Sequence, residues 1–199
     1  MFNLFKKKYS AQNRAYLIAT TTGEYSSGLD KTVNEFLERY PDHKGNKNRI
    51  IDELQWIIST GGLVAIRLLS DHKKVKETYS ELIEFYRALH KSNDNSTLFT
   101  DTYLIAMDKK FESYMIRFNR GIVLREETSS TYDEALFDVA NESMKYFTGE
   151  TRHFKVVDFE DIDKLQQRPD PNELEHLVKT ILGQFVAIFV SDFKKVQIV

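Results

Sequence analysis

Residues that interrupt helices are scarce in this chain, which has three prolines and eight glycines among its 199 residues. Proline breaks a helix interior because it lacks the amide hydrogen and clashes with the preceding turn, and glycine weakens a helix through its backbone entropy. The chain also has 14 phenylalanines and 10 tyrosines, which supply bulky material for a core. Few breakers and many large apolar side chains therefore predict a mainly α protein.

The clearest helix signal lies near the carboxyl end. In the run from Arg168 to Glu173, Asp170 is placed to cap a helix, Pro171 falls at the first helical position, and Glu173 completes a capping box. Apolar residues then recur at three- and four-residue steps as far as residue 190. The stripe is wide enough to need burial on more than one side, so we predict that residues 171–190 form the central helix.

Five further helices are predicted from the same periodicity and from helix-ending residues. The segment at 132–147 begins with a Thr131-x-x-Glu134 capping box, and the segment at 98–119 is expected to end before Gly121. The other three predicted segments are 33–40, which stops at Pro41; 50–58, which stops at Gly61-Gly62; and 75–89, which is followed by a polar loop at 91–96.

Three short apolar segments, 16–21, 63–69 and 153–159, have enough β-branched or aromatic content to form strands. Periodicity alone cannot assign such short runs, and helix or loop is the preferred interpretation for the first and last. We therefore predict one α-helical domain over residues 1–199, a bundle of seven to nine helices with room for a short two-stranded β element. Within this domain, we expect residues 1–9 to be a mobile N-terminal segment of basic and apolar residues.

The chain contains no cysteine, which excludes disulfides, thiolate catalysis and cysteine-bound metals. Its first eight residues place Phe2, Leu4 and Phe5 before three lysines, the reverse of a secretory signal. The most apolar window, 181–190, is too short to cross a bilayer core of about 30 Å. We expect a cytoplasmic protein with no transmembrane segment, whose N-terminus offers at most a weak peripheral contact with an anionic membrane.

Charge is unevenly distributed along the chain. Residues 126–175 carry fourteen acidic and five basic side chains, a net charge of −9, whereas the whole chain has a net charge of −2. Such a field attracts partners of opposite sign. Part of the bias is explained by acids in first helical turns, where the helix dipole favours them. The acidic balance predicts a basic protein partner and argues against nucleic acid.

The densest part of this acidic segment is the run from Asp158 to Asp163, in which four carboxylates alternate with apolar residues. The sequence predicts a non-enzymatic interaction protein, of the immunity or antitoxin type or an adaptor, that presents an acidic surface with aromatic anchors. The predicted partner-binding residues are Glu126, Glu127, Tyr132, Asp133, Glu134, Asp158, Phe159, Glu160, Asp161 and Asp163.

An enzyme is the alternative. Two Glu-x-x-His pairs, Glu150 with His153 and Glu173 with His176, have the spacing that binds metal on helices of a di-iron bundle. However, Glu150 follows a glycine and Glu173 stands at a helix start, whereas the metal geometry requires mid-helix positions. The chain has no phosphate-binding glycine loop and no G-x-S-x-G motif, so we expect no cofactor and no catalytic residues.

Overall fold

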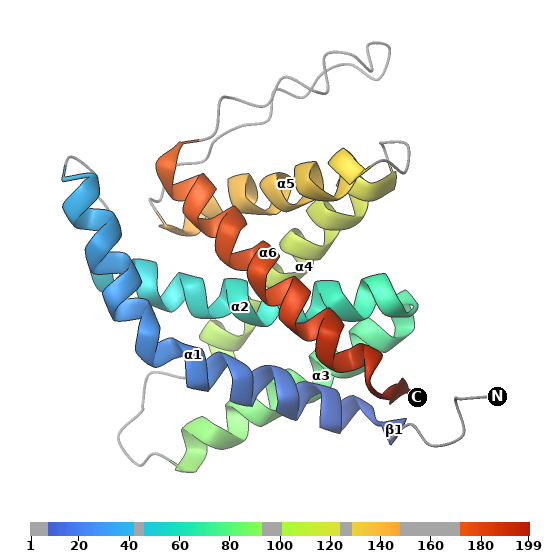
Figure 1. Ribbon diagram of the computed structural model, residues 1–199. Helices are drawn as coiled ribbons and strands as arrows, with labels where there is room; N and C mark the ends of the chain where they lie inside the picture. Colours follow the sequence, from blue (N-terminus) through green and yellow to red (C-terminus); the bar gives the residue numbers. More distant parts are fainter. Residues whose placement is uncertain (1–7, 42–45, 93–100, 124–128, 148–171) are drawn as a thin grey trace.

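The computed structural model describes residues 8–41, 46–92, 101–123, 129–147 and 172–199 (Figure 1). The described residues are mainly helical, as predicted, but they form six helices rather than seven to nine. The elements in chain order are β1 (Lys8–Tyr9), α1 (Ala11–Arg39), α2 (Lys47–Leu69), α3 (His72–Ser92), α4 (Asp101–Val123), α5 (Ser129–Phe147), α6 (Glu173–Lys194) and β2 (Gln197–Ile198).

The helix count is lower partly because α1 is one continuous helix. It begins at a capping box between Ser10 and Asn13 and ends at Arg39, so the predicted helix at 33–40 is only its last part. Residues 16–21, a candidate strand, lie inside it. The hydroxyl of Thr22 donates to the Ile18 carbonyl, and tertiary burial of one face holds this stretch of weak helix formers in helical form.

The prediction that Gly61-Gly62 ends a helix is wrong, because α2 runs through both glycines to Leu69. A β-carbon on Gly61 would lie 3.1 Å from the Phe185 β-carbon on α6, and one on Gly62 would lie 2.5 Å from Ile18 on α1. The two glycines therefore allow α6 and α1 to approach α2 closely from different sides. Residues 63–69, which periodicity could not assign, form the last turns of the same helix.

The central helix is α2 rather than α6. Helix α2 contacts every other helix that the structure describes, and residues 56–66 are all buried (Figure 1). The prediction for α6 failed because hydrophobicity alone does not distinguish a helix covered on all sides from one covered on one broad face. One hydrophobic cluster nevertheless includes buried residues from all six helices.

Helix α6 crosses α2 and also packs against α5 (Figure 1). Among the described helices it alone is long and apolar enough to cross a membrane by length and composition, with a mean hydropathy of 1.4 in its most apolar window. Its apolar face is buried in the protein, and its exposed positions form a stripe of small and polar side chains at helical spacing. This packing is typical of a core helix in a globular protein.

Three predicted helix boundaries need correction. Helix α4 continues past Gly121, because this glycine packs directly against Ala135 of α5. Helix α5 begins at Ser129, so Thr131 lies inside the helix and not at its cap. Helix α6 is capped by Asn172 rather than Asp170, and its capping-box partner is Glu175 rather than Glu173. Residues 153–159 and 93–96 lie outside the described residues.

The expected two-stranded element is present, but it joins the two ends of the described chain. Strands β1 and β2 are parallel and pair Lys8 with Gln197 and Tyr9 with Ile198. The junction is held by Arg14, which is fully buried. Its Nη1 donates to the carbonyls of Tyr9 (2.9 Å) and Val199 (2.7 Å), and its Nε donates to Thr78 Oγ1 on α3 (2.7 Å). One side chain thus connects α1, α3, β1 and the residue that follows β2.

Candidate functional site

Most of the predicted partner-binding surface lies outside the described residues. This holds for seven of its ten members: Glu126, Glu127, Asp158, Phe159, Glu160, Asp161 and Asp163. The structure describes Tyr132, Asp133 and Glu134, all in the first turns of α5 and all half-buried.

The contacts of Tyr132 and Asp133 lie within the protein. The Tyr132 ring packs edge-on against Phe118 of α4, with ring centroids 6.3 Å apart. Burial and the nearby charge of Asp133 raise the pKa of Tyr132 to about 12. Asp133 forms an ion pair with Lys179 of α6 at 2.5 Å. These side chains therefore help to hold α5 between α4 and α6.

Glu142 on α5 is the centre of a charged cluster with α4. Its side chain is only 9% exposed and accepts hydrogen bonds from Ser113, Arg117 and Lys145. Burial alone would raise the pKa of Glu142, but the hydrogen bonds from Lys145 and Ser113 and the charges of Lys145 and Arg117 outweigh it and lower the pKa. Glu142 therefore acts as an ionic connection between α4 and α5.

The substitution Glu142→Gln should make stability less dependent on pH. A carboxylate whose pKa is lowered by folding stabilises the protein above its unfolded-state pKa, and this contribution is lost as the pH falls through the folded-state value. At pH 7 the variant should lose about 2 kcal/mol of unfolding free energy, the loss expected for hydrogen bonds to a charged group. Below about pH 4 the difference from the parent should shrink. Urea unfolding of the parent and the variant, at pH 7 and again below pH 4, measures the difference in unfolding free energy.

The control for this variant is Glu35→Gln, because Glu35 forms an exposed ion pair with Lys31 on α1. Its effect should stay below about 0.5 kcal/mol at either pH. An equal loss in both variants, or a loss in Glu142→Gln that persists unchanged in acid, would contradict the role assigned to Glu142.

A third acid of the segment, Glu175, also makes contacts within the protein. It is 1% exposed, accepts a hydrogen bond from Asn141 Nδ2 of α5 at 2.6 Å, and closes the α6 capping box through the Asn172 amide. Asp133, Glu142 and Glu175 thus all serve packing between helices. The described part of the acidic segment contributes less free negative charge than the sequence suggests.

The residues of the alternative metal site are only partly described. Glu173 and His176 are exposed in the first turn of α6, and the His176 ring packs edge-on against Phe137 with centroids 5.2 Å apart. Glu150 and His153 lie outside the described residues. Within the described ranges, no three histidine or carboxylate side chains come together in a way that could hold a metal ion.

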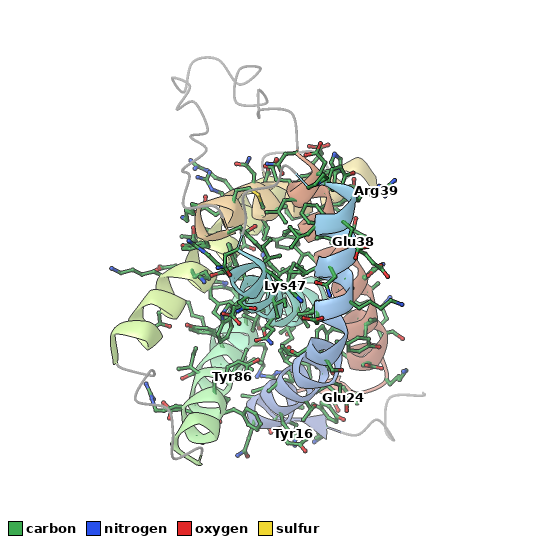
Figure 2. All side chains as sticks on the ribbon, turned by 90° about the vertical axis from the view of Figure 1, so that its left-hand side faces the viewer. Tyr16, Glu24, Glu38, Arg39, Lys47 and Tyr86 are labelled. Carbon is green, nitrogen blue, oxygen red and sulfur yellow. The ribbon has the colours of Figure 1, made fainter. Side chains whose placement is uncertain are left out.

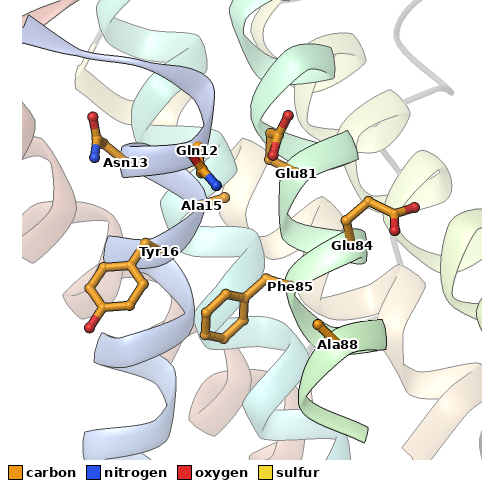
Figure 3. Close-up of a pocket in the computed structure, with 8 residues that line it drawn as sticks. All are labelled: Gln12, Asn13, Ala15, Tyr16, Glu81, Glu84, Phe85 and Ala88. Carbon is orange, nitrogen blue, oxygen red and sulfur yellow. The ribbon is translucent and has the colours of Figure 1, made fainter. Parts of the chain in front are cut away.

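An open groove lies between α1 and α3 (Figure 3). It encloses about 430 Å³ and is open to solvent. We call it the α1/α3 groove. The residues that line it are Gln12, Asn13, Ala15, Tyr16, Glu81, Glu84, Phe85 and Ala88.

The groove has an aromatic part and a polar part. Tyr16 and Phe85 meet across it edge to face, with centroids 5.9 Å apart and ring planes at 80° (Figure 3). Gln12 lies one helical turn before Tyr16, and Glu81 one turn before Phe85, so the polar pair lies next to the aromatic pair (Figure 3). Ala88 lines the groove with a small side chain (Figure 3).

The two carboxylates of the groove differ in their partners. Glu84 forms an ion pair with Arg87 on its own helix and points away from α1 (Figure 3). Glu81 is exposed and has no ion pair or hydrogen bond among the described residues. Among the described residues, the groove therefore presents one carboxylate without an ion pair next to exposed aromatic surface.

The walls of the groove are held by the buried Arg14. Its bond to Thr78 joins α1 to α3 one turn before Glu81, and Glu77 lies 3.7 Å from its Nη2. Burial lowers the pKa of Arg14, and the charge of Glu77 opposes that effect. Deeper in the core, α1 and α3 are also linked through α2. The hydroxyl of Ser59 on α2 forms hydrogen bonds with Thr22 of α1 and with Tyr86 of α3. Buried polar contacts thus hold together the two helices that form the groove.

The sequence contained one local signal for this groove. On α1 the buried positions Ala15, Ile18 and Ala19 form one stripe, and Tyr16 lies outside that stripe with 58% of its surface exposed (Figure 2). A single exposed aromatic residue is a weak signal by itself, because such residues are common on protein surfaces. No known protein family, curated protein or solved structure matches this chain.

Proposed function

We propose that this chain is a non-enzymatic helical interaction protein that binds a basic protein partner in the cytoplasm, as an inhibitor of the immunity or antitoxin type or as an adaptor. The observation that supports this most is the α1/α3 groove, in which Glu81, which has no ion pair with any described residue, lies one turn from Phe85 and close to the exposed Tyr16. A carboxylate beside aromatic rings is suited to a cationic side chain.

The α1/α3 groove and the acidic run from Asp158 to Asp163 have different roles in this proposal. Buried aromatic contacts supply most of the affinity of protein interfaces, whereas charges outside the core of an interface mainly speed association. Tyr16 and Phe85 are therefore the anchors, and Glu81 fixes the cation between them. The run from Asp158 to Asp163 attracts the same partner at longer range.

The proposal predicts salt-sensitive binding of basic peptides. A short peptide rich in arginine, lysine and leucine should bind the full chain, and its acidic counterpart should not. The association rate should fall steeply as ionic strength rises, because salt screens exposed charges beyond about 10 Å at 0.1 M. Stopped-flow fluorescence with a labelled peptide measures the association rate and the dissociation rate.

Charge reversals separate the two regions. Glu81→Lys should abolish binding, whereas the triple reversal of Glu160, Asp161 and Asp163 to Lys should slow association and leave dissociation unchanged. Glu24→Lys is the control, since Glu24 is an exposed acid on α1 outside the groove (Figure 2). Equal binding of the acidic peptide, or an association rate that ignores salt, would overturn the proposal.

A further inference from the structure

We infer that the α1/α3 groove is a receptor for an arginine side chain, which it selects over lysine. This inference rests on the proposed function, because it names the group of the basic partner that the groove recognises. Two features of the groove support it: the geometry of the aromatic pair and the arrangement of acceptors.

The aromatic pair leaves room for a planar group. Because Tyr16 and Phe85 meet edge to face, at least one face of the Tyr16 ring is not covered by Phe85, and 58% of the tyrosine is exposed. A guanidinium is flat and weakly hydrated and stacks on aromatic faces, whereas the lysine ammonium is a compact and strongly hydrated point charge. The ring geometry therefore favours arginine.

The acceptors of the groove suit a cation with several donors. Glu81 offers two carboxylate oxygens that no described residue occupies, which matches the paired donors of a guanidinium. Gln12 adds an amide oxygen on the facing helix. Asn13 adds less, since its Oδ1 already accepts the Ser10 amide in the α1 capping box. A lysine ammonium also has several donors, but it lacks the planar fork that pairs with both carboxylate oxygens.

The test uses three capped peptides that differ at one central residue, which is arginine, lysine or the uncharged arginine isostere citrulline. Each is titrated into the ¹⁵N-labelled full chain and followed by amide chemical shifts. The arginine peptide should shift residues of the groove and bind about two- to fivefold more tightly than the lysine peptide, the factor expected for one exposed stacking contact. The citrulline peptide should show no saturable shifts.

Variants assign this preference to particular side chains. Tyr16→Leu keeps an apolar side chain but removes the ring, so it should remove the difference between arginine and lysine. Glu81→Gln should weaken both peptides, and Ala88→Leu should block the groove. The matched controls are Glu24→Gln and Ala187→Leu, which change exposed helical residues outside the groove and should leave both affinities unchanged.

The outcomes separate this inference from the proposed function. Equal affinity for arginine and lysine in the groove would overturn arginine selection while a basic partner remains in place. Equal affinity for citrulline and arginine would overturn both, because the positive charge would then contribute nothing to binding. Shifts that map away from α1 and α3 would overturn the groove as the receptor. If neither these peptides nor the longer basic peptide binds, the proposed function itself fails.

Discussion

Substituting Gly121 by alanine should destabilise the protein strongly. A β-carbon at this position would lie 2.8 Å from the Ala135 β-carbon and 2.9 Å from both the Ala135 α-carbon and Asp138 Oδ2 on α5. Because a backbone atom is among these neighbours, α4 and α5 would have to separate. The free energy of unfolding should fall by about 2 kcal/mol, the typical cost of overpacking, although alanine itself favours a helix by about 1 kcal/mol.

The same change at Gly28 is the control. Gly28 lies within α1, and a β-carbon there would meet nothing within 4 Å. Gly28→Ala should therefore stabilise the protein by about 0.5–1 kcal/mol, through helix propensity and a less flexible unfolded chain. Urea denaturation of both variants gives the two midpoints. Shifts of the same sign would contradict the close packing of α4 on α5.

Replacing Arg14 by methionine should have the other large effect. Methionine keeps much of the buried volume, so the variant mainly removes the bonds to Thr78 and to the carbonyls of Tyr9 and Val199. Breaking a buried polar network of this kind costs about 3 kcal/mol. The Val199 amide, which donates to the Tyr9 carbonyl, should also lose its protection from hydrogen exchange.

Arg39→Met provides the comparison. Arg39 is exposed at the end of α1 (Figure 2), and its replacement should change the unfolding free energy by less than about 0.5 kcal/mol. Val199 should keep its exchange protection in this variant. If Arg14→Met is as mild as Arg39→Met, then Arg14 does not hold the two chain ends together.

The helices were predictable from sequence because periodic apolar residues and scarce breakers act locally. The predicted end at Pro41 is confirmed, since α1 stops at Arg39. The break at Gly61-Gly62 was wrong for a physical reason that no local rule contains. Glycine weakens an isolated helix, but here it allows α6 and α1 to pack close to α2, and that tertiary gain outweighs the propensity.

The start of α6 illustrates the same limit. Asp170 with Glu173 and Asn172 with Glu175 both fit a capping box in the sequence. The structure uses the second, in which Glu175 also reaches Asn141 of α5. Local sequence offers both caps, and a contact with a distant helix distinguishes them.

The candidate site was the least predictable feature. Acidic residues could be counted, but whether each is free or paired depends on its neighbours in space, as Asp133 with Lys179 shows. The groove joins Tyr16 to Phe85, which are far apart in the chain, and only the exposed position of Tyr16 on its helix left a trace in the sequence.

The contact between α2 and α6 also matters for biosynthesis. Helix α2 leaves the ribosome long before α6, yet the surface of α2 around Gly61 is covered by Phe185 and Val186 of α6. That apolar surface therefore stays open to water, chaperones and other nascent chains until residues 173–194 have been synthesised. Translation speed through the intervening segment then sets how long the incomplete chain is exposed to aggregation.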